Sequence, residues 1–367
     1  GSRVAQRVAG RGSRSGSRVA GRAAGVARMS PLRCATLRSV TKATRVTVLA
    51  GGFGGARMAH GFALLGGAVE LTVIGNTGDD LVLHGLHISP DLDTVMYTLA
   101  GLANDETGWG VKGETWSAAQ MLERYGEPTW FRLGDRDLGT HIVRTDRMAA
   151  GGRLTDVTSE LTRALGIAAR ILPMTDDPVR TKVGTPEGWL DFQDYFVRQH
   201  HAAEVEQLRF EGVEDARPTA QVLDAVASAD LVVIAPSNPF VSVAPVLAIG
   251  GMLDHLRDSP APVIAVSPIV GGEALRGPAA QMMRSLGGVP SAAGIATHYA
   301  ERYPGLLDVL VIDEADADAA TEIGSLGIQP EVASIVIPDE SSRAALAMRI
   351  LAIGAHLQTK ERAQPGG

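Results

Sequence analysis

The chain has 367 residues, enough for one large α/β domain or two smaller ones with ample core. Its hydrophobic content of 45% and charged content of 20% are typical of a soluble globular protein, and no apolar run approaches the length of a membrane span. The single cysteine, Cys34, excludes an intrachain disulfide framework and a cysteine metal cluster, and it favours a cytoplasmic location.

The net charge of −7 is distributed unevenly. Residues 1–45 hold ten arginines and one lysine without any acid, while the remaining residues carry 23 basic and 41 acidic side chains. The strongly acidic remainder of the chain argues against nucleic acid as the main partner. The first segment is rich in Gly, Ser, Ala and Arg and lacks aliphatic periodicity, so we expect residues 1–44 to form a disordered basic extension.

A glycine-rich loop follows the first predicted strand, Val46–Ala50. It holds Gly51, Gly52, Gly54 and Gly55, and the residues from Ala56 to Leu65 have helical character. Glycines let the backbone approach a phosphate, and the first N–H groups and the dipole of a helix favour negative charge. The loop therefore predicts an anion site, although a tight turn alone would give the same pattern.

The two common phosphate-binding motifs do not fit this loop. A dinucleotide fingerprint needs a third glycine where Arg57 stands, and an acid at the end of the second strand, where the chain has Gly75-Asn76. A Walker A loop needs a closing Gly-Lys-Ser/Thr, which is missing. The predicted phosphate site is of neither type.

Strand-like and helix-like segments alternate along most of the chain. The pattern predicts a mainly parallel, doubly wound Rossmann-like sheet in an α/β domain spanning residues 45–355, with a flexible tail over 356–367. Further strands are expected at Val69–Ile74, Asp230–Ala235, Pro262–Val266, Leu307–Ile312 and Ala333–Ile337. Helices are expected over Thr94–Leu102, with Asp93 as N-cap, after Pro239 to Leu256, after Gly272 to Leu286, and over Ser341–Ile353.

Residues 104–200 interrupt this alternation, and we expect them to form a mostly helical insertion that caps the substrate site. Three of the four tryptophans, Trp109, Trp116 and Trp130, lie close together here. Such side chains are usually core, and a smaller share line pockets for flat ligands.

Loops that follow the strands carry the polar candidates. Ligands bind beyond the carboxyl ends of parallel strands, so the glycine loop, the Asn76–Asp80 loop and the Pro236–Pro239 loop are expected to converge. Asp79, Asp80, Asp91 and Asp93 would repel a phosphate unless a cation lay between them, and Mg²⁺ prefers such oxygen ligands. We interpret Asp80 and Asp93 as a metal pair, whereas Asp91 fits a turn or cap role.

Two further polar groups leave alternatives open. The segment Gly134–Asp137 with His141 could be a buried ion-pair network or could contact substrate. Ser237 and Asn238 could bind a nucleotide base or ribose, or could cap the next helix. No Ser-His-Asp or Cys-His arrangement is evident, so positioning and metal electrostatics, as in phosphoryl transfer, remain the favoured chemistry.

Several motifs occur in the order seen in one family. They are Val48-Leu-Ala-Gly-Gly-Phe-Gly-Gly-Ala-Arg57, Asn76-Thr-Gly-Asp-Asp80, Ser89-Pro-Asp-Leu-Asp-Thr94, Leu133-Gly-Asp-Arg-Asp137 with Thr140-His141, and Ala235-Pro-Ser-Asn-Pro239. Over about residues 45–355 the chain resembles the 2-phospho-L-lactate transferase family, whose actinobacterial branch comprises the phosphoenolpyruvate transferases.

The resemblance implies a Mg²⁺-dependent transferase of coenzyme F-420 biosynthesis. Such an enzyme moves phospho-lactate or phospho-enolpyruvate from a guanylyl-pyrophosphate-linked donor (GDP/GTP-derived) to the terminal hydroxyl of the deazaflavin Fo, and GMP leaves. It also implies a homodimer.

The resemblance also implies roles for individual residues. Asp80 and Asp93 would be catalytic and would hold the metal with Asp79, and Asp93 would contact the deazaflavin together with Arg132, where many members have Lys. The nucleotide and its phosphates would lie against Gly51, Gly52, Gly54, Gly55, Asn76, Ser237 and Asn238. The alternative is a non-enzymatic nucleotide-sugar-binding regulator with a related glycine loop; Ser89–Thr94 and Leu133–Asp137 favour the transferase.

Overall fold

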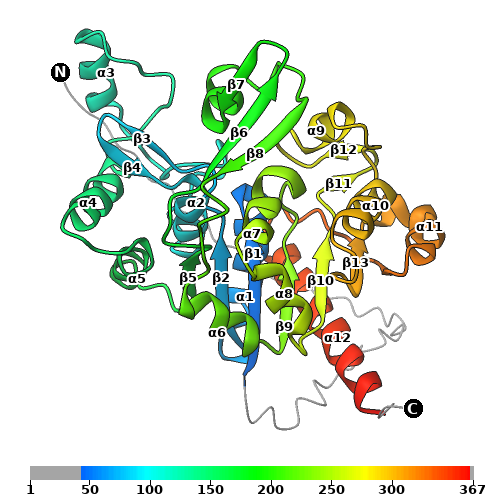
Figure 1. Ribbon diagram of the computed structural model, residues 1–367. Helices are drawn as coiled ribbons and strands as arrows, with labels where there is room; N and C mark the ends of the chain where they lie inside the picture. The colour runs from blue at the N-terminus through cyan, green and yellow to red at the C-terminus, as the bar shows by residue number, and fades with distance from the viewer. Residues whose placement is uncertain (1–42, 364–367) are drawn as a thin grey trace, which may run out of the picture. The chain divides into compact units, whose positions relative to one another are not determined.

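The computed structural model describes residues 43–363, and its centre is a seven-stranded sheet (Figure 1). All neighbouring strands run parallel, in the order β14-β13-β10-β9-β1-β2-β5. The predicted Rossmann-like α/β class is therefore confirmed, and the expected basic extension lies almost wholly outside the described residues. The strand bounds are β1 Thr44–Ala50, β2 Val69–Gly75, β5 Arg170–Pro173, β9 Leu231–Ile234, β10 Val263–Val266, β13 Val309–Ile312 and β14 Gln329–Val332.

Alternate residues of the strands point into two separate cores. In β1, Val46 and Val48 pack in one core, whereas Leu49 packs in the other. This period of two is what a strand buried on both faces requires. The first core is covered by α1 Gly52–Ala63, α2 Pro90–Leu99 and α12 Glu340–Ala363. The second is covered by α6 Ala220–Ala227, α7 Ala244–Ala248, α8 Met252–Asp258, α9 Ala279–Ser285, α10 Ala292–Arg302 and α11 Ala320–Ser325.

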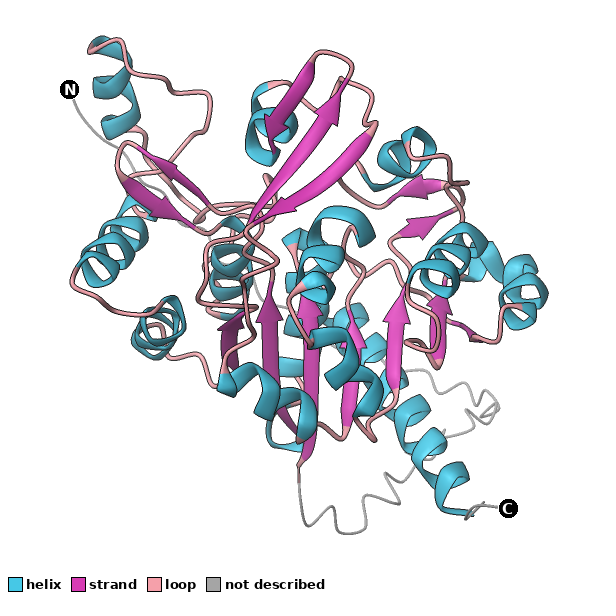
Figure 2. Ribbon diagram, viewed as in Figure 1, coloured by secondary structure: helices cyan, strands magenta, loops and turns pink. Residues whose placement is uncertain are grey.

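The segment expected as an insertion is more mixed than predicted. It holds α3 Ser117–Arg124, α4 Asp137–Ala149 and α5 Leu154–Ala164, but β5 also belongs to it and pairs with β2 at the edge of the main sheet. A separate antiparallel sheet follows, in the order β7-β6-β8 (Figure 2). Its strands are β6 Arg180–Thr185, β7 Gly188–Asp191 and β8 Gln207–Glu211. Only one face of β6 is well buried, so its sequence lacks the long apolar run of the central strands.

The last part of the chain requires three corrections. Residues 333–337 form no strand, although Ile335 and Ile337 are buried; the edge strand β14 precedes them. Helix α12 continues through Ala363, where a flexible tail was predicted from residue 356, and the last four residues lie outside the described part. A small hairpin, β11 Ile269–Val270 with β12 Glu273–Ala274, stands where only a loop and helix were expected.

The helical segment after β9 is bent. A π-helical turn, Pro239–Val243, leads into α7, and α8 follows after a break. Among residues 43–363 no single helix has the length and apolarity of a membrane span; one pair, Pro239–Ala248 with Met252–Asp258, passes that test together by length and composition only, with a bend of 84°.

Candidate active site

Three strand ends meet at one cavity, as predicted. The loops after β1, β2 and β9 contribute Gly51, Asp79 and Ser237 to the lining of a space of about 580 Å³. Because β2 lies on one side of β1 and β9 on the other, the cavity lies at the point where the strand order reverses. This is where ligands bind in open α/β sheets.

The glycine loop requires glycine because other backbone approaches it closely. Gly52 has φ +62°, and a Cβ at Gly54 would lie 2.3 Å from the carbonyl oxygen of Pro236. Helix α1 begins at Gly52, and no side chain of its N-cap residue, Gly51, caps it. Gly51, Gly52 and Gly54 line the cavity, whereas Gly55 lies behind them against Ser237. The helix end therefore favours an anion, and in this structure the Asp91 carboxylate accepts from its first N–H, that of Gly52.

The loop after β9 is tied to the glycine loop through Ser237. The Ser237 hydroxyl accepts from Gly51 N at 3.1 Å and donates to Gly51 O at 2.8 Å. Asn238 Oδ1 accepts from Phe240 N at 2.9 Å, so this side chain caps the π-helical turn. Both residues line the cavity. The predicted capping role is confirmed for Asn238, and nucleotide binding by the pair stays a prediction.

Asp91 joins the second loop to the first. Its carboxylate accepts from Gly52 N at 2.5 Å and from Asn76 Nδ2 at 2.9 Å. Helix α2 starts at Pro90, so Asp91 and Asp93 both lie in its first turn; the expected N-cap role of Asp93 is wrong, and Ser89 occupies that position. Asn76 is fully buried and does not line the cavity, and it positions Asp91; its contact with the nucleotide stays a prediction.

Two carboxylates crowd the same amide. Asn76 Nδ2 also donates to Asp79 Oδ1 at 3.1 Å. Burial, with the charges of Asp91 and Asp80, raises the pKa of Asp79 well above its ordinary value. Burial also raises the pKa of Asp91 to about 6, although the bonds from Asn76 and Gly52 act in the opposite direction. Among the described residues neither Asp79 nor Asp91 forms an ion pair, although the charge of Arg180 opposes the rise in the pKa of Asp79.

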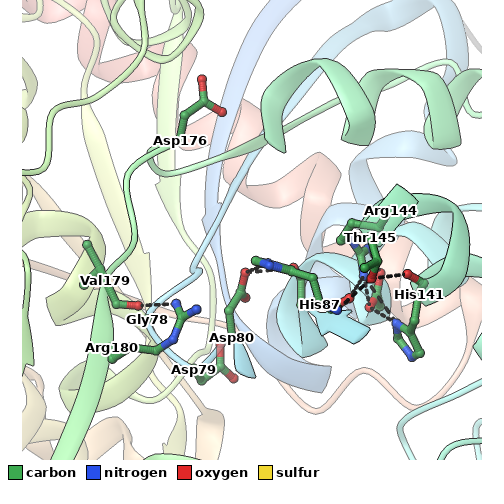
Figure 3. A network of polar contacts seen from close by, with 12 residues as sticks. Gly78, Asp79, Asp80, His87, His141, Arg144, Thr145, Asp176, Val179 and Arg180 are labelled. Carbon is green, nitrogen blue, oxygen red and sulfur yellow. Dashed lines mark hydrogen bonds and ion pairs between the residues drawn. The ribbon is translucent and has the colours of Figure 1, made fainter. Parts of the chain in front are cut away.

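Asp80 lies behind this wall. Its Oδ2 lies 3.0 Å from His87 Nε2 and accepts from the Ser89 hydroxyl at 2.8 Å, and Figure 3 shows the carboxylate directed at the His87 ring. Its other oxygen, Oδ1, is buried without a hydrogen-bond partner. A buried carboxylate oxygen without a donor is costly unless a cation satisfies it.

Asp93 belongs to a buried network centred on α4. Arg144 donates to both of its oxygens, and His141 Nδ1 lies 3.7 Å from Asp93 Oδ2. On the far side of the ring, His141 Nε2 lies 3.3 Å from Asp137, which also accepts from the Tyr97 hydroxyl at 2.6 Å. Burial acts to raise the pKa of Asp137, but the bonds from His141 and Tyr97 hold it below the ordinary value. Asp93, Asp137 and His141 all line the cavity.

Aromatic side chains form another part of the wall. Trp109, Trp130 and Phe131 line the cavity, and Trp130 and Phe131 meet edge to face with ring centroids 5.8 Å apart. Arg132 also lines it, with its guanidinium carbon 4.4 Å from the ring centroid of Trp116. The wall offers flat apolar surface with one cation beside it.

The donor set fits a magnesium ion of the kind that shares its ligands with a substrate. Within residues 43–363 no three His, Cys, Asp or Glu side chains are grouped as a ready-made metal site. Mg²⁺ commonly takes only one or two carboxylates and completes its shell with water and phosphate oxygens. The orphan oxygen of Asp80 and the crowded carboxylates of Asp79 and Asp91 match that requirement. Asp93 already has Arg144 as its counter-charge, and Asp80 does not line the cavity, so this geometry does not favour the Asp80–Asp93 metal pair, which stays a prediction.

Several candidate functional residues were not predicted from the sequence. Arg144 was missed, although Asp137, His141 and Arg144 follow the i, i+4, i+7 spacing of one helix face. Asp91 was read as a turn former because its bond to Gly52 spans 39 residues and leaves no local signal. Arg276, which also lines the cavity, belongs to no motif, and Phe53 lies within the glycine-loop motif but was given no role of its own.

Known proteins similar to this chain share most of its length. The family model of 2-phospho-L-lactate transferase CofD matches residues 46–352. A phosphoenolpyruvate transferase from Kitasatospora aureofaciens is 41% identical over 315 residues, covering 84% of this chain and 97% of that protein. The corresponding protein from Streptomyces griseus subsp. griseus is 42% identical over 312 residues, covering 84% and 97%. One from Mycobacterium avium is 41% identical over 300 residues, covering 74% and 89%.

Solved structures support the fold alone. A member of the UPF0052 family from Bacillus halodurans superimposes with a TM-score of 0.60 at 15% identity, covering 84% of this chain and 99% of that chain. Identity this low carries no conclusion about chemistry.

Proposed function

Because the chain belongs to the family of 2-phospho-L-lactate transferase CofD, we propose that it transfers a phospho-acid group to the deazaflavin Fo in coenzyme F-420 biosynthesis. The donor is a guanylyl-pyrophosphate-linked phospho-enolpyruvate or phospho-lactate, and GMP is released. The names of the related transferases favour enolpyruvate over lactate. One observation carries the proposal: a single cavity brings a glycine loop, several carboxylates and an aromatic wall together.

The diphosphate of the donor fits the polar side of the cavity. The N-terminus of α1 favours an anion there, and Gly54 leaves room for the close approach of phosphate oxygens. Ser237 holds the Gly51 backbone in place through its two hydrogen bonds. These residues therefore bind and orient the donor.

The deazaflavin fits the aromatic side. Its ring system is flat and largely apolar, and Trp109, Trp130 and Phe131 supply matching surface. Arg132 adds a cation that can donate to the carbonyl oxygens of the ring. Bound in this way, the ribityl chain of Fo can extend toward the carboxylates.

The acceptor hydroxyl is then positioned by Asp93. The carboxylate faces the cavity, and Arg144 fixes its orientation with two hydrogen bonds. The hydroxyl oxygen attacks the phosphorus that carries the acid, and the bond from that phosphorus to the GMP oxygen breaks. Asp93 accepts the hydroxyl proton late in the step, as expected where the nucleophile needs little activation.

A magnesium ion would complete this site. Oxygens of Asp79 and Asp80, with Asp91 beside them, would hold it together with the diphosphate of the donor. When bound, the ion would neutralise the charge that collects on the leaving GMP. Asn76 keeps Asp79 and Asp91 in position through its amide.

A direct assay tests this function against simple nucleotide binding. The protein is mixed with Fo, Mg²⁺ and the enolpyruvate or lactate donor, and GMP and the phosphodiester product are measured by chromatography. We expect both products to form in equal amounts, and we expect Asp93→Asn to form neither at a comparable rate. If no donor gives product while a nucleotide sugar binds tightly, the chain acts as a binding protein and the proposed transfer is wrong.

A further inference from the structure

The proposed transfer places no part of either substrate on one wall of the cavity. This wall is formed by residues 192–201, which connect β7 to β8 and include a π-helical turn, Asp194–Arg198. We call residues 192–201 the histidine turn. Its side chains that line the cavity are Phe192, Gln193, Phe196, Val197 and His200.

The backbone at the end of the histidine turn is strained. His200 and His201 have φ +51° and +46°, and within residues 43–363 the one other non-glycine residue with positive φ is His84. The left-handed conformation is unfavourable for a residue with a Cβ and persists only where surrounding contacts impose it. One such contact is the hydrogen bond from His201 N to the carbonyl oxygen of the buried Tyr195, at 2.8 Å.

Side chains hold the turn in this conformation. His201 Nδ1 lies 3.0 Å from Gln281 Oε1 on α9, and Gln281 Nε2 donates to His201 O at 2.7 Å. The rings of Phe192, Phe196 and His201 stack in sequence, with centroids 5.5 and 5.7 Å apart. The imidazole of His200 has no hydrogen bond, ion pair or ring contact with any described residue, and it lines the cavity. The turn therefore fixes His200 and leaves both of its ring nitrogens available to a ligand.

The other end of the histidine turn is bonded to the carboxylates of the cavity. Gln193 is buried, and its Nε2 donates to Asp79 O at 3.2 Å and to Asp79 Oδ2 at 3.3 Å. Asp79 belongs to the group that would hold the diphosphate of the donor through a cation. The histidine turn therefore begins beside the place proposed for the reacting phosphate.

The stereochemistry of the transfer directs the acid toward a free wall. The attacking and leaving oxygens lie roughly in line at the phosphorus, so the bond to the acid points sideways from that line. The proposed acceptor lies at Asp93 and the aromatic wall, and the leaving GMP lies at the glycine loop. The histidine turn is the side that neither of them occupies.

The carboxylate of the acid needs a hydrogen-bond donor on that side. In the described part of the chain, the basic side chains that line the cavity are Arg132, His141, His200 and Arg276. Arg132 and Arg276 each lie over an aromatic ring, and His141 is buried between two carboxylates. His200 is the one of the four without a partner, and an imidazole N–H donates well to a carboxylate.

We propose that His200 binds the carboxylate of the transferred acid and that Phe196 and Val197 cover its apolar carbons. This inference rests on the proposed transfer and assigns the acid end of the donor to a defined wall. It makes His200 a substrate-binding residue that distinguishes a phospho-acid donor from a donor without a carboxylate.

Titration with two matched donors tests the assignment. One is the guanylyl-pyrophosphate-linked enolpyruvate, and the other carries an isopropenyl group, which has the same branching without the carboxylate. Without Fo no acceptor is present, so calorimetry measures binding alone. His200→Gly accepts a positive φ without strain; it should bind the enolpyruvate donor about tenfold more weakly than the wild type and the isopropenyl donor equally well. His200→Gln keeps a side-chain N–H and should recover part of the loss.

A second histidine provides the matched control. His84 also has φ +51° and does not line the cavity, so His84→Gly should bind both donors like the wild type. Urea denaturation of each variant checks that the fold is kept. Wild-type affinity of His200→Gly for the enolpyruvate donor would show that His200 does not bind the carboxylate. An equal loss for both donors would show that the turn only shapes the cavity, and the assignment would again be wrong.

Turnover separates this inference from the proposed function. If product forms with Fo and His200→Gly has the wild-type KM for the enolpyruvate donor, the transferase stands and the role of His200 is wrong. If the wild type forms no product while His200→Gly loses affinity for the enolpyruvate donor alone, the transferase is wrong and the carboxylate assignment holds. A wild type that binds neither donor would overturn both proposals.

Discussion

Arg144 contacts both carboxylate oxygens of Asp93, and both side chains are buried. The pair joins α4 to the first turn of α2 across 51 residues of sequence. It sets the orientation of Asp93 on the cavity wall and gives this carboxylate a counter-charge within the protein. Asp93 therefore differs from Asp79 and Asp91, which form no ion pair with an arginine or lysine among the described residues.

Removing Arg144 should destabilise the protein. Arg144→Ala leaves the Asp93 carboxylate buried without its partner, and such a change typically costs about 3–5 kcal/mol. Urea denaturation measures the free energy of unfolding. Arg147→Ala is a matched control on the same helix, because its ion pairs are exposed and are worth at most about 1 kcal/mol. Equal losses in the two variants would show that the buried pair adds nothing to stability.

Two substitutions of Asp93 should have different effects on turnover and on the free energy of unfolding. Asp93→Asn keeps the size of the side chain but removes the charge, so we expect turnover to fall by at least about a hundredfold, the scale of a lost acid–base group. Asp93→Ala should also lower the free energy of unfolding, because Arg144 then loses its carboxylate. Activity assays and denaturation are run on the same preparations. Full turnover in Asp93→Asn would exclude this residue from the proton transfer.

The buried carboxylates Asp79 and Asp91 should make the free energy of unfolding depend on pH. Burial raises the pKa of Asp91 to about 6 in the folded protein, against 3.8 for the free group. Folding therefore takes up a proton between about pH 4 and 6, so this group's contribution to stability is lost as pH rises through that window. Asp79, whose pKa is also raised, acts in the same direction.

The variant Asp91→Asn isolates this effect. The free energy of unfolding of Asp91→Asn should exceed that of the wild type by about 2 kcal/mol more at pH 7 than at pH 4. The reason is that the wild type must ionise the buried Asp91 as pH rises, whereas asparagine has no proton to lose. Denaturation curves at pH 4, 5, 6 and 7 give the comparison. Asp156→Asn, at an exposed ion pair, should follow the wild-type profile. Parallel profiles for Asp91→Asn and the wild type would contradict the raised pKa.

Divalent ions should bind to the carboxylates on this side of the cavity. Chelation should abolish transfer and added Mg²⁺ should restore it, and Asp79→Asn should weaken the ion's apparent affinity at least about tenfold. Titration of activity against free Mg²⁺ measures this. Asp176→Asn, a carboxylate that binds Thr155 outside the cavity, serves as the control. Transfer that continues unchanged in excess chelator would remove the metal from the proposed chemistry.

The aromatic wall should set the affinity for the acceptor. Trp130→Ala removes apolar surface on which the deazaflavin would lie, so KM for Fo should rise about tenfold while KM for the donor stays constant. The intrinsic fluorescence of Fo provides a binding assay that does not depend on turnover. Trp189, exposed on β7 and outside the cavity lining, offers the matched Trp189→Ala control. An unchanged Fo affinity in Trp130→Ala would place the acceptor elsewhere.

The sequence carried enough information for the sheet and the glycine loop. Buried parallel strands such as β1 and β9 are continuous apolar runs, and the loops that follow them must meet at one edge of the sheet. The short strands β6 to β8 were not predicted, because each has a solvated face and carries charged residues such as Lys182 and Asp191. Their pairing depends on contacts that no local pattern encodes.

The polar site was predictable only in outline. The acids were found because they cluster in two consecutive loops, but their partners could not be assigned. Arg144 pairs with Asp93 and not with Asp137, which is nearer in the sequence. The Asp91 carboxylate accepts a hydrogen bond from Gly52 N in a different loop. Those choices depend on how α2 and α4 are placed against the sheet, which is set by tertiary packing. The three strand-end loops converged as predicted because topology alone fixes their position.

The central claim is that one cavity holds both substrates, with the acceptor hydroxyl between Asp93 and the donor's phosphorus. A crystal structure with Fo, GMP and Mg²⁺ tests it most directly. We predict the deazaflavin ring against Trp130 and Phe131, the GMP phosphate at the N-terminus of α1, and the ribityl hydroxyl within hydrogen-bond distance of Asp93. Fo bound outside this cavity, or GMP bound away from the glycine loop, would contradict the account.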